Sequence, residues 1–232
     1  MDSKKDPSQP SKKKFSRRTF LSHSVAMFGT SAFSYGRILG SNDRLSVGHI
    51  GIGSRGREHD QMLVQLKDKF NVEMTAVCDL WKMNRDRAVV AAEKAYGRAP
   101  RAFQYMDDLL GLKDVDAVLI ATGDFQHAPI LKRVAEAGKD AYCEKPMAND
   151  LDEAKAARDA VLAKNLIVQI GTQHRSEPYP IAVRNLIKTG VLGDVSKVEI
   201  VWNYHGPRWR GRPEVKQIRP EDTDWRKWLL SK

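Results

Sequence analysis

A glycine-rich turn near the start of the folded part of the chain has the residue types and spacing needed to bind a dinucleotide. Gly51, Gly53 and Gly56 form a GxGxxG pattern with Ser54 and Arg55 inside it. The pattern follows an apolar run directly and begins a helical one, which is the context that gives it meaning. Glycines let the backbone approach a pyrophosphate, and free N–H groups at a helix start attract its charge. We therefore predict that these five residues bind a cofactor.

An acidic residue supports the same chemistry. Asp79 ends the next apolar run, about 23 positions after Gly56, at a spacing that suits a carboxylate bound to a ribose 2′-OH. The same charge repels a 2′-phosphate, so NAD is the expected cofactor. NADP stays as the alternative, because Arg55 could meet either the pyrophosphate or a 2′-phosphate. A tight turn with an N-cap acid is the purely structural interpretation.

Further candidates follow other apolar runs. His127 lies where a helix is expected to begin, near the crevice at the carboxyl ends of the strands, and a cofactor-pocket role competes there with a plain capping role. Thr122, in the same loop, could contact the cofactor. Gln173, His174 and Arg175 lie at an expected domain junction, where they face substrate or cofactor or act as a structural hinge.

The elements that must position these residues alternate regularly between strand and helix. Apolar runs at 45–53, 72–79, 116–123, 140–146 and 166–171 are separated by helical patterns at 57–70, 83–97, 128–138 and 149–165. In the first helix, Met62, Leu63, Leu66 and Phe70 recur at helical spacing. Gly97 and Gly138 are expected stops, and Asn149/Asp150 an N-terminal cap. Such alternation predicts an α/β fold with a doubly wound, parallel sheet.

The pattern changes after Gly171. A helix with a turn is predicted within 178–193, and residues 194–205 alternate as in a half-covered strand, with Val198, Ile200, Trp202 and Tyr204 on one face. This predicts the start of an α+β domain with an open, mostly antiparallel sheet. One strand cannot make a stable sheet, so the domain at 172–232 is expected to be incomplete. Its apolar face predicts association with a partner.

The amino terminus has the features of an export signal. Lysines precede Ser16-Arg17-Arg18-Thr19-Phe20-Leu21 and a weakly apolar run, as in a twin-arginine signal; a disordered basic tail is the alternative. The run at 25–33 is too short for a stable membrane span. We therefore divide the chain into a signal and linker at 1–40, a dinucleotide-binding Rossmann domain at 41–171 and the incomplete domain at 172–232. Export through the twin-arginine machinery would place the protein in the periplasm or outside the cell.

Charge and cysteine content narrow the function classes. The net charge of +10 is concentrated in the leader, and no stripe of basic and aromatic residues indicates nucleic-acid binding. Cys78 and Cys143 lie far apart in apolar runs and are expected to be buried free thiols. Metal-ligand spacings are absent from the sequence, so no metal is predicted.

Several short motifs resemble one family. The sequence "EKP" (144–146) after a dinucleotide fingerprint resembles the glucose–fructose oxidoreductase/inositol dehydrogenase/MocA (Gfo/Idh/MocA) family. "ATGDFQHA" (121–128) is similar to a loop of that family, with Gly123 where proline is usual; "GTQHRS" (171–176), "GVLGDVSKVE" (190–199) and "DWRKWLL" (224–230) resemble exported members. The resemblance covers about residues 45–230 and implies a Rossmann domain followed by an open-sheet domain.

The resemblance also implies roles for the EKP residues. Lys145 matches a lysine that approaches the nicotinamide and the substrate hydroxyl, and a partly desolvated ammonium can donate to a developing alkoxide or carbonyl oxygen. Glu144 matches an acid that orients the ribose and nicotinamide end of the cofactor. Pro146 would turn the chain, often through a cis bond. The family's Asp/His acid–base pair comes from a later helix that this sequence does not contain.

Together these features predict an exported NAD-dependent oxidoreductase that acts on a sugar, polyol or inositol-like substrate. A tightly bound cofactor is expected, since free NAD(H) is scarce outside the cytoplasm, and the full-length protein is expected to be a homo-oligomer. Two alternatives remain. One is an NAD-dependent glycosidase that oxidises its substrate transiently and eliminates the aglycone; the other is a non-catalytic dinucleotide-binding fragment.

Overall fold

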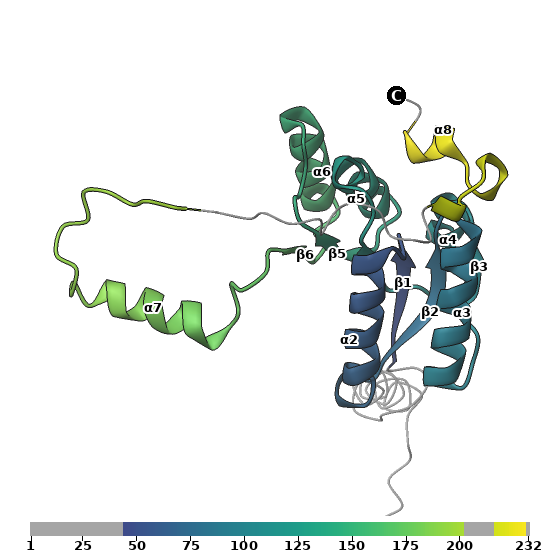
Figure 1. The fold of residues 1–232 in the computed structure, drawn as a ribbon, viewed down its shortest axis with the longest axis horizontal. Helices are drawn as coiled ribbons and strands as arrows, with labels where there is room; N and C mark the ends of the chain where they lie inside the picture. Colours follow the sequence, from purple (N-terminus) through teal and green to yellow (C-terminus); the bar gives the residue numbers. More distant parts are fainter. Residues whose placement is uncertain (1–43, 202–215, 231–232) are drawn as a thin grey trace, which may run out of the picture. The chain divides into compact units, whose positions relative to one another are not determined.

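The computed structural model of the protein describes residues 44–201 and 216–230. Strands and helices alternate through most of the described chain (Figure 1). The strands are β1 (Leu45–Ile50), β2 (Val72–Cys78), β3 (Arg101–Phe103), β4 (Ala117–Ile120), β5 (Asp140–Glu144) and β6 (Val168–Gly171). The helices are α2 (Ser54–Phe70), α3 (Lys82–Tyr96), α4 (Met106–Leu110), η1 (Asp124–Gln126), α5 (His127–Glu136), α6 (Leu151–Ala163), α7 (Pro178–Lys188), η4 (Pro220–Asp222) and α8 (Trp225–Trp228).

The six strands form one parallel sheet in the order β3-β2-β1-β4-β5-β6. The strand order reverses between β1 and β4, which makes this the switch point at which ligands bind in doubly wound folds. Register places Ile50 opposite both Cys78 and Ile120, and Ile120 opposite Cys143. The segments after β1, β2, β4 and β5 therefore leave the sheet at one edge, which confirms the predicted fold class for this part of the chain.

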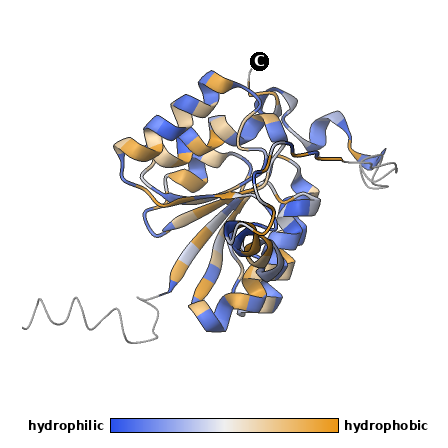
Figure 2. Ribbon diagram, turned by 90° about the vertical axis from the view of Figure 1, so that its left-hand side faces the viewer, coloured by the Kyte–Doolittle hydropathy of each residue, from blue (hydrophilic) through white to orange (hydrophobic). Residues whose placement is uncertain are grey.

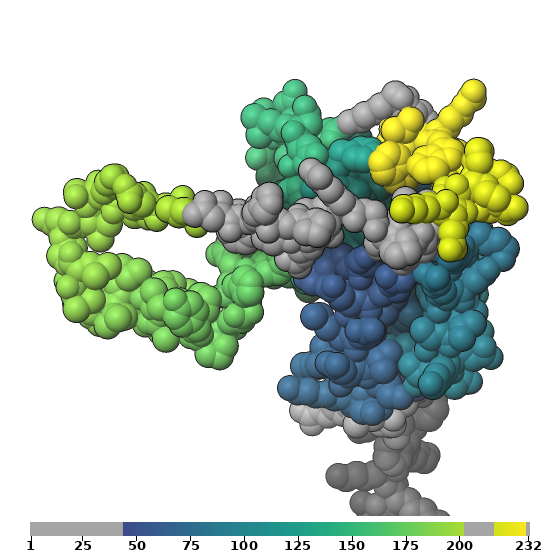
Figure 3. All heavy atoms as spheres, viewed as in Figure 1, coloured from purple at the N-terminus to yellow at the C-terminus, as the bar shows by residue number. Residues whose placement is uncertain are grey.

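Helices cover both faces of the sheet. One apolar cluster joins Ile50, Ile120 and Cys143 to residues of α4, α5 and α6 on one face. On the other face, α3 packs through Ala88 and Ala92, and α2 through Leu63. Apolar residues are concentrated on the strands, and hydrophilic residues occupy much of the helix surfaces (Figure 2). In Figure 3, α2 and α3 form one continuous surface over their face of the sheet.

Three helix ends follow from local sequence. Gly97 ends α3 with a φ of 74°, a left-handed conformation that glycine adopts without a Cβ clash. Gly138 follows α5 with a φ of 73°. Asp150 caps α6, since its carboxylate accepts hydrogen bonds from the N–H groups of Asp152 and Glu153, each at 2.9 Å. These predicted stops and this predicted cap are confirmed.

The sheet-facing side of α2 differs from the expectation. Of the four apolar residues at helical spacing, only Leu63 packs against a core, whereas Met62, Leu66 and Phe70 are exposed. The buried residues of this helix are Gly56, His59 and Asp60, which continue to Leu63 at i, i+3, i+4 and i+7. A polar helix face can be buried because the sheet beneath it supplies partners for the polar groups.

Two short elements, β3 and α4, were not foreseen, because three and five residues are too few to show a period. Helix α7 confirms the helix expected after residue 177. The predicted strand at 194–205 is wrong over its described part: residues 194–201 form no strand, and Val198 and Ile200 are 73% and 89% exposed. A strand requires a hydrogen-bonded neighbour, and the described residues supply none to this segment. Trp202, Tyr204 and the predicted signal lie outside the described residues.

Candidate active site

The turn between β1 and α2 has room for nothing larger than glycine at two positions. Gly51 has a φ of +88°, and a Cβ there would lie 2.6 Å from Thr122 Cγ2 and 2.8 Å from the Ala121 carbonyl oxygen. A Cβ on Gly56 would lie 2.3 Å from the Gly51 carbonyl oxygen. A Cβ essentially never lies within 3.0 Å of a non-bonded heavy atom, so the turn packs tightly against the start of its own helix and against the end of β4.

The start of α2 offers backbone donors. Gly53 is the N-cap residue, no side chain caps the helix, and its first turn contains no acidic residue. The first N–H groups of a helix, here those from Ser54 onward, have no intrahelical acceptor. They therefore form a site for an anion such as a pyrophosphate.

Asp79 ties the glycine turn to the end of β2. Its Oδ2 accepts hydrogen bonds from the Ile52 N–H (2.7 Å) and the Asn84 amide (3.0 Å), and its Oδ1 accepts one from the Trp81 N–H (2.8 Å). A carboxylate has about four acceptor positions, so one remains for a ribose hydroxyl. Burial raises the pKa of Asp79, although the three hydrogen bonds oppose this rise.

Thr122 and His127 fit a cofactor that is bound between the glycine turn and β4. His127 is buried and its Nδ1 donates to the Pro146 carbonyl oxygen at 2.7 Å. His127 Nε2 and Thr122 Oγ1 are both buried without a hydrogen-bond partner among the described residues. Unsatisfied buried polar atoms are rare. These two are consistent with a polar ligand, and the glycine turn beside them is shaped for its backbone approach.

The loop that carries these two residues tolerates its glycine well. Gly123 has a φ of −74°, a value that proline also adopts. Its N–H donates to Gln126 Oε1 at 3.0 Å, a bond that the family's usual proline could not make. The exchange of proline for glycine thus keeps the backbone path and adds a hydrogen bond.

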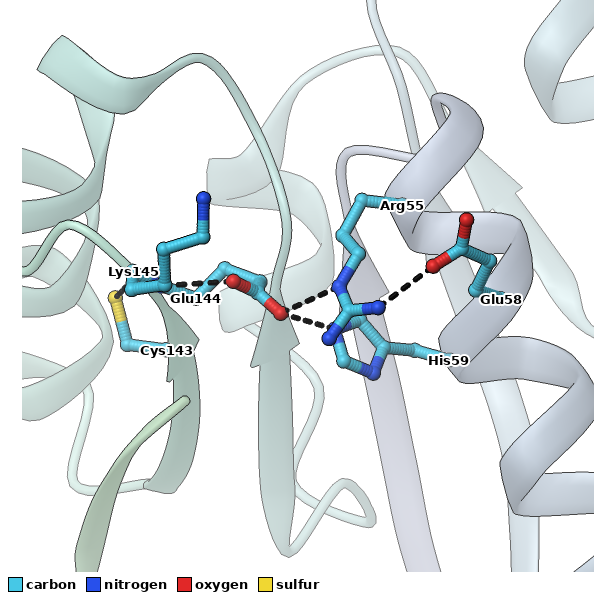
Figure 4. Close-up of polar contacts among 6 residues, drawn as sticks. All are labelled: Arg55, Glu58, His59, Cys143, Glu144 and Lys145. Carbon is cyan, nitrogen blue, oxygen red and sulfur yellow. Dashed lines mark hydrogen bonds and ion pairs between the residues drawn. The ribbon is translucent and has the colours of Figure 1, made fainter. Parts of the chain in front are cut away.

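Glu144 makes a network that the sequence pattern does not predict (Figure 4). Its Oε1 accepts from Arg55 Nε at 2.6 Å and from His59 Nε2 at 2.9 Å, and its Oε2 accepts from the Lys145 N–H at 2.9 Å. Arg55 also pairs with Glu58 at 2.6 Å. Arg55 and His59 lie four residues apart on α2, and that spacing, with a histidine on the sheet-facing side, is the signal that could have revealed the network.

Charge and burial compete at this network. Burial alone would raise the pKa of Glu144, but hydrogen bonds from Arg55, the Lys145 N–H and His59 outweigh burial and lower it. Burial, helped by the nearby Arg55 charge, lowers the pKa of His59 in spite of its bond to Glu144. His59 is therefore neutral at pH 7, and its Nε2–H donates to an ionised carboxylate.

Lys145 follows this network at the carboxyl end of β5. It is exposed, and in Figure 4 its side chain extends away from Arg55 and His59. The Lys145–Pro146 bond is cis, as the resemblance implied. The arrangement leaves the Lys145 ammonium available to a ligand while its backbone is fixed by Glu144.

The three junction residues lie on the exposed connection between β6 and α7. Gly171 is opposite Glu144 in the sheet register, so Gln173, His174 and Arg175 leave the sheet on the same edge as Lys145. His174 Nδ1 lies 2.7 Å from Glu177 Oε1. The substrate role of these residues stays a prediction.

Both cysteines are free and buried, as expected, and burial raises the pKa of each thiol to about 12. No group of three or more potential metal-ligating side chains occurs within 44–201 and 216–230. None of the helices in these ranges is long and apolar enough to cross a membrane.

Comparison with known proteins places this geometry in a family. A Shewanella baltica protein named glycosyl hydrolase family 109 protein is 30% identical over 203 residues, covering 85% of this chain and 42% of its own length. Two solved structures share the fold. The WlbA dehydrogenase of Bordetella pertussis, in complex with NADH and UDP-GlcNAcA, is 27% identical with a TM-score of 0.56. The scyllo-inositol dehydrogenase of Lactobacillus casei, with bound NAD(H) and scyllo-inositol, is 23% identical with a TM-score of 0.58.

Each of these two structures covers 65% of this chain, which in turn covers 43% of each. The chain thus spans less than half the length of the relatives that it matches. The sequence profile of the Gfo/Idh/MocA family, described as an oxidoreductase family with an NAD-binding Rossmann fold, matches residues 45–172, more than half of the chain. The glycine turn, the switch point and the sequence match agree: the chain belongs to the Gfo/Idh/MocA family of oxidoreductases.

Proposed function

We propose that the protein is an NAD-dependent oxidoreductase that acts on a CH–OH group of a carbohydrate-like substrate. The observation that carries this proposal is the register of the sheet. It brings the glycine turn after β1, Asp79 after β2, Thr122 after β4 and Lys145 after β5 to one edge, on both sides of the switch point. The family membership supports NAD binding, whereas the activity of the whole protein is our proposal.

The residues divide into a binding group and a reacting group. Backbone N–H groups from Ser54 onward hold the pyrophosphate, Asp79 holds a ribose hydroxyl, and Thr122 and His127 contact the cofactor from the β4–α5 loop. Bound there, the nicotinamide supplies a hydride acceptor or donor. Lys145 donates a hydrogen bond to the substrate oxygen whose bond order changes, which stabilises charge on that oxygen. Gln173, His174 and Arg175 face the substrate from the connection between β6 and α7.

NAD is preferred to NADP in this proposal for two reasons. The Asp79 carboxylate would repel a 2′-phosphate, and its three hydrogen bonds hold it in place. Arg55, the residue that could have bound a 2′-phosphate, is paired with Glu144 and Glu58. A difference of at least tenfold in affinity corresponds to about 1.4 kcal/mol, which one repelled charge supplies.

Titration of the purified protein with NADH and with NADPH, followed by nicotinamide fluorescence, tests the binding site. We expect NADH to bind at least about tenfold more tightly. Failure of both nucleotides to bind would refute the proposal. Turnover is then assayed on a panel of sugars, polyols and inositols by NADH absorbance. Lys145→Met should abolish turnover and leave NADH affinity nearly unchanged; binding without turnover on the whole panel would favour the non-catalytic alternative.

A glycosidase is the second candidate, because the Shewanella baltica relative is named a glycosyl hydrolase family 109 protein. In such a reaction transient oxidation acidifies a neighbouring C–H and permits loss of the aglycone, with the hydride returned afterwards. Release of nitrophenol from nitrophenyl glycosides without net formation of NADH would establish this activity. Net NADH formation without nitrophenol release would establish the dehydrogenase.

We further propose that the protein is exported by the twin-arginine route to the periplasm or beyond, retains its NAD and forms a homo-oligomer. Paired Arg17 and Arg18 motivate the export proposal. Each of the three proposals has its own test. Arg17→Lys/Arg18→Lys should keep a fused reporter in the cytoplasm, which tests export. Mass spectrometry of the purified protein should find NAD, and light scattering should find more than one copy of the chain in each particle.

A further inference from the structure

We propose that Glu144 is a positioning residue that connects the dinucleotide turn to Lys145, and that it does not bind the cofactor directly. The proposal rests on the proposed function, in which Lys145 meets the substrate. It differs from the role that family resemblance implies for this acid, namely orienting the ribose and nicotinamide end of the cofactor.

The first observation is that the carboxylate is already engaged on both oxygens. Arg55 Nε and His59 Nε2 donate to Oε1, and the Lys145 N–H donates to Oε2. The side chain is only 3% exposed. Three donors leave about one acceptor position free, as at Asp79. Asp79 is only half-buried, however, whereas Glu144 is buried. A ribose hydroxyl would therefore have to displace one of the three donors of Glu144 within a buried environment, which is costly. The contacts therefore favour a role inside the protein.

The second observation is that the three donors come from the two segments that the proposed function needs, the dinucleotide turn with its helix and Lys145. Arg55 is itself part of the GxGxxG turn, and His59 is one helical turn further along α2. The third donor is the backbone N–H of Lys145, the residue with the proposed reacting ammonium. One carboxylate thus joins the segment that holds the pyrophosphate to the segment that holds the lysine, across the switch point of the sheet.

The third observation is that His59 is held from a second side. Its ring makes an edge contact with Tyr142 on β5, with 5.2 Å between ring centroids. Tyr142 and Glu144 are two residues apart on one strand and therefore face the same side of the sheet. His59 therefore links α2 to the end of β5 through two contacts. Its removal should change the position of Glu144 and thus the hydrogen bond to the Lys145 N–H.

The backbone amide of Lys145, observed by NMR in the full chain labelled with ¹⁵N-lysine and assigned with Lys145→Arg, tests the proposal. Glu144→Gln is nearly isosteric and removes the charge. His59→Leu removes a donor, whereas His59→Gln keeps a nitrogen donor close to the Nε2 position. Arg55→Met removes the other donor, and Arg133→Gln is a matched control, since Arg133 pairs with Asp107 at 2.6 Å on an exposed surface.

We expect Glu144→Gln, His59→Leu and Arg55→Met to shift the Lys145 amide signal and to speed its exchange with solvent at least about tenfold without any nucleotide, because they weaken or realign its acceptor. His59→Gln and Arg133→Gln should resemble the unaltered protein. An unchanged Lys145 amide in His59→Leu and Arg55→Met would overturn the proposal. So would an effect of Glu144→Gln that arises only when NADH is present, since that is the behaviour of a cofactor ligand.

The two failures are distinguishable. If the unaltered protein binds no NADH, the proposed function fails, while the comparison of nucleotide-free amide signals still decides the role of Glu144. Circular dichroism of each variant separates a local change from unfolding, and the isosteric Glu144→Gln keeps the comparison open if His59→Leu does not fold.

Discussion

Replacement of Gly56 by alanine is the sharpest test of how the dinucleotide turn works. The added Cβ would lie 2.3 Å from the Gly51 carbonyl oxygen, whereas ordinary contact begins at 3.4 Å. Both partners of this clash are backbone or fixed to it, so the first turn of α2 must move by about 1 Å, and overpacking of this kind costs roughly 1–3 kcal/mol of stability. The same movement draws the N–H donors away from the position of the pyrophosphate.

The loss of one hydrogen bond to a charged group is about 1.5–3 kcal/mol, so NADH affinity should fall roughly 10- to 150-fold. Fluorescence titration measures the affinity, and urea unfolding measures the stability. Gly111→Ala is the matched control: Gly111 has a φ of −68°, and an added Cβ meets nothing closer than 3.4 Å. It should leave affinity unchanged and stability equal or slightly higher. Unchanged NADH affinity in Gly56→Ala would refute the packing argument.

Three further predictions concern charge and burial. Asp79→Asn should narrow the preference for NADH over NADPH, because it removes the charge that repels a 2′-phosphate; competitive titration checks the ratio, and an unchanged ratio would contradict the assignment. Because the pKa values of His59 and Glu144 are both lowered on folding, the stability that they contribute is present above their unfolded values, about 6.5 and 4.5, and is lost as pH falls through the folded values. The melting temperature should therefore drop as the pH falls below about 6.5, and less steeply in His59→Gln; equal slopes would exclude His59 as a cause. Cys78 and Cys143, with pKa values of about 12, should resist iodoacetamide at pH 8 in the folded protein and react once urea unfolds it, whereas rapid labelling in the folded protein would show that the thiols are accessible.

The alternation of strands and helices could be predicted because each element is long enough to show its own period and is bounded by local signals. Gly97 and Asp150 act on their immediate neighbours, so their effect is visible in sequence. The same holds for the turn at 51–56, in which strand, glycines and helix are contiguous. Site residues that directly follow a strand, such as Asp79 and Lys145, therefore lie at the edge of the sheet that the sequence predicts.

Features that depend on distant partners could not be predicted in this way. Hydrophobicity alone predicts that Met62 is buried and His59 exposed, but the structure shows the reverse. His59 can be buried because it contacts Glu144, which only the fold brings next to α2. His49 and Asp60, buried against each other at 2.5 Å, show the same effect. Residues 194–201 alternate between apolar and polar as a strand does. A strand also needs a hydrogen-bonded neighbour, which the alternation cannot supply.

The polar underside of α2 has a consequence for how the chain must be assembled. Every sequence feature of the nucleotide motif lies between residues 45 and 79, and a ribosome would complete that stretch early. Yet Arg55 and His59 find their acceptor 89 and 85 positions later. Closing a loop of this length has an entropic cost that must be met before the contact forms. An isolated β1-α2-β2 unit, although it carries the whole motif, would leave His59 without its carboxylate and Arg55 paired with Glu58 but not with Glu144. The motif is therefore local in sequence, while the site that it builds is not.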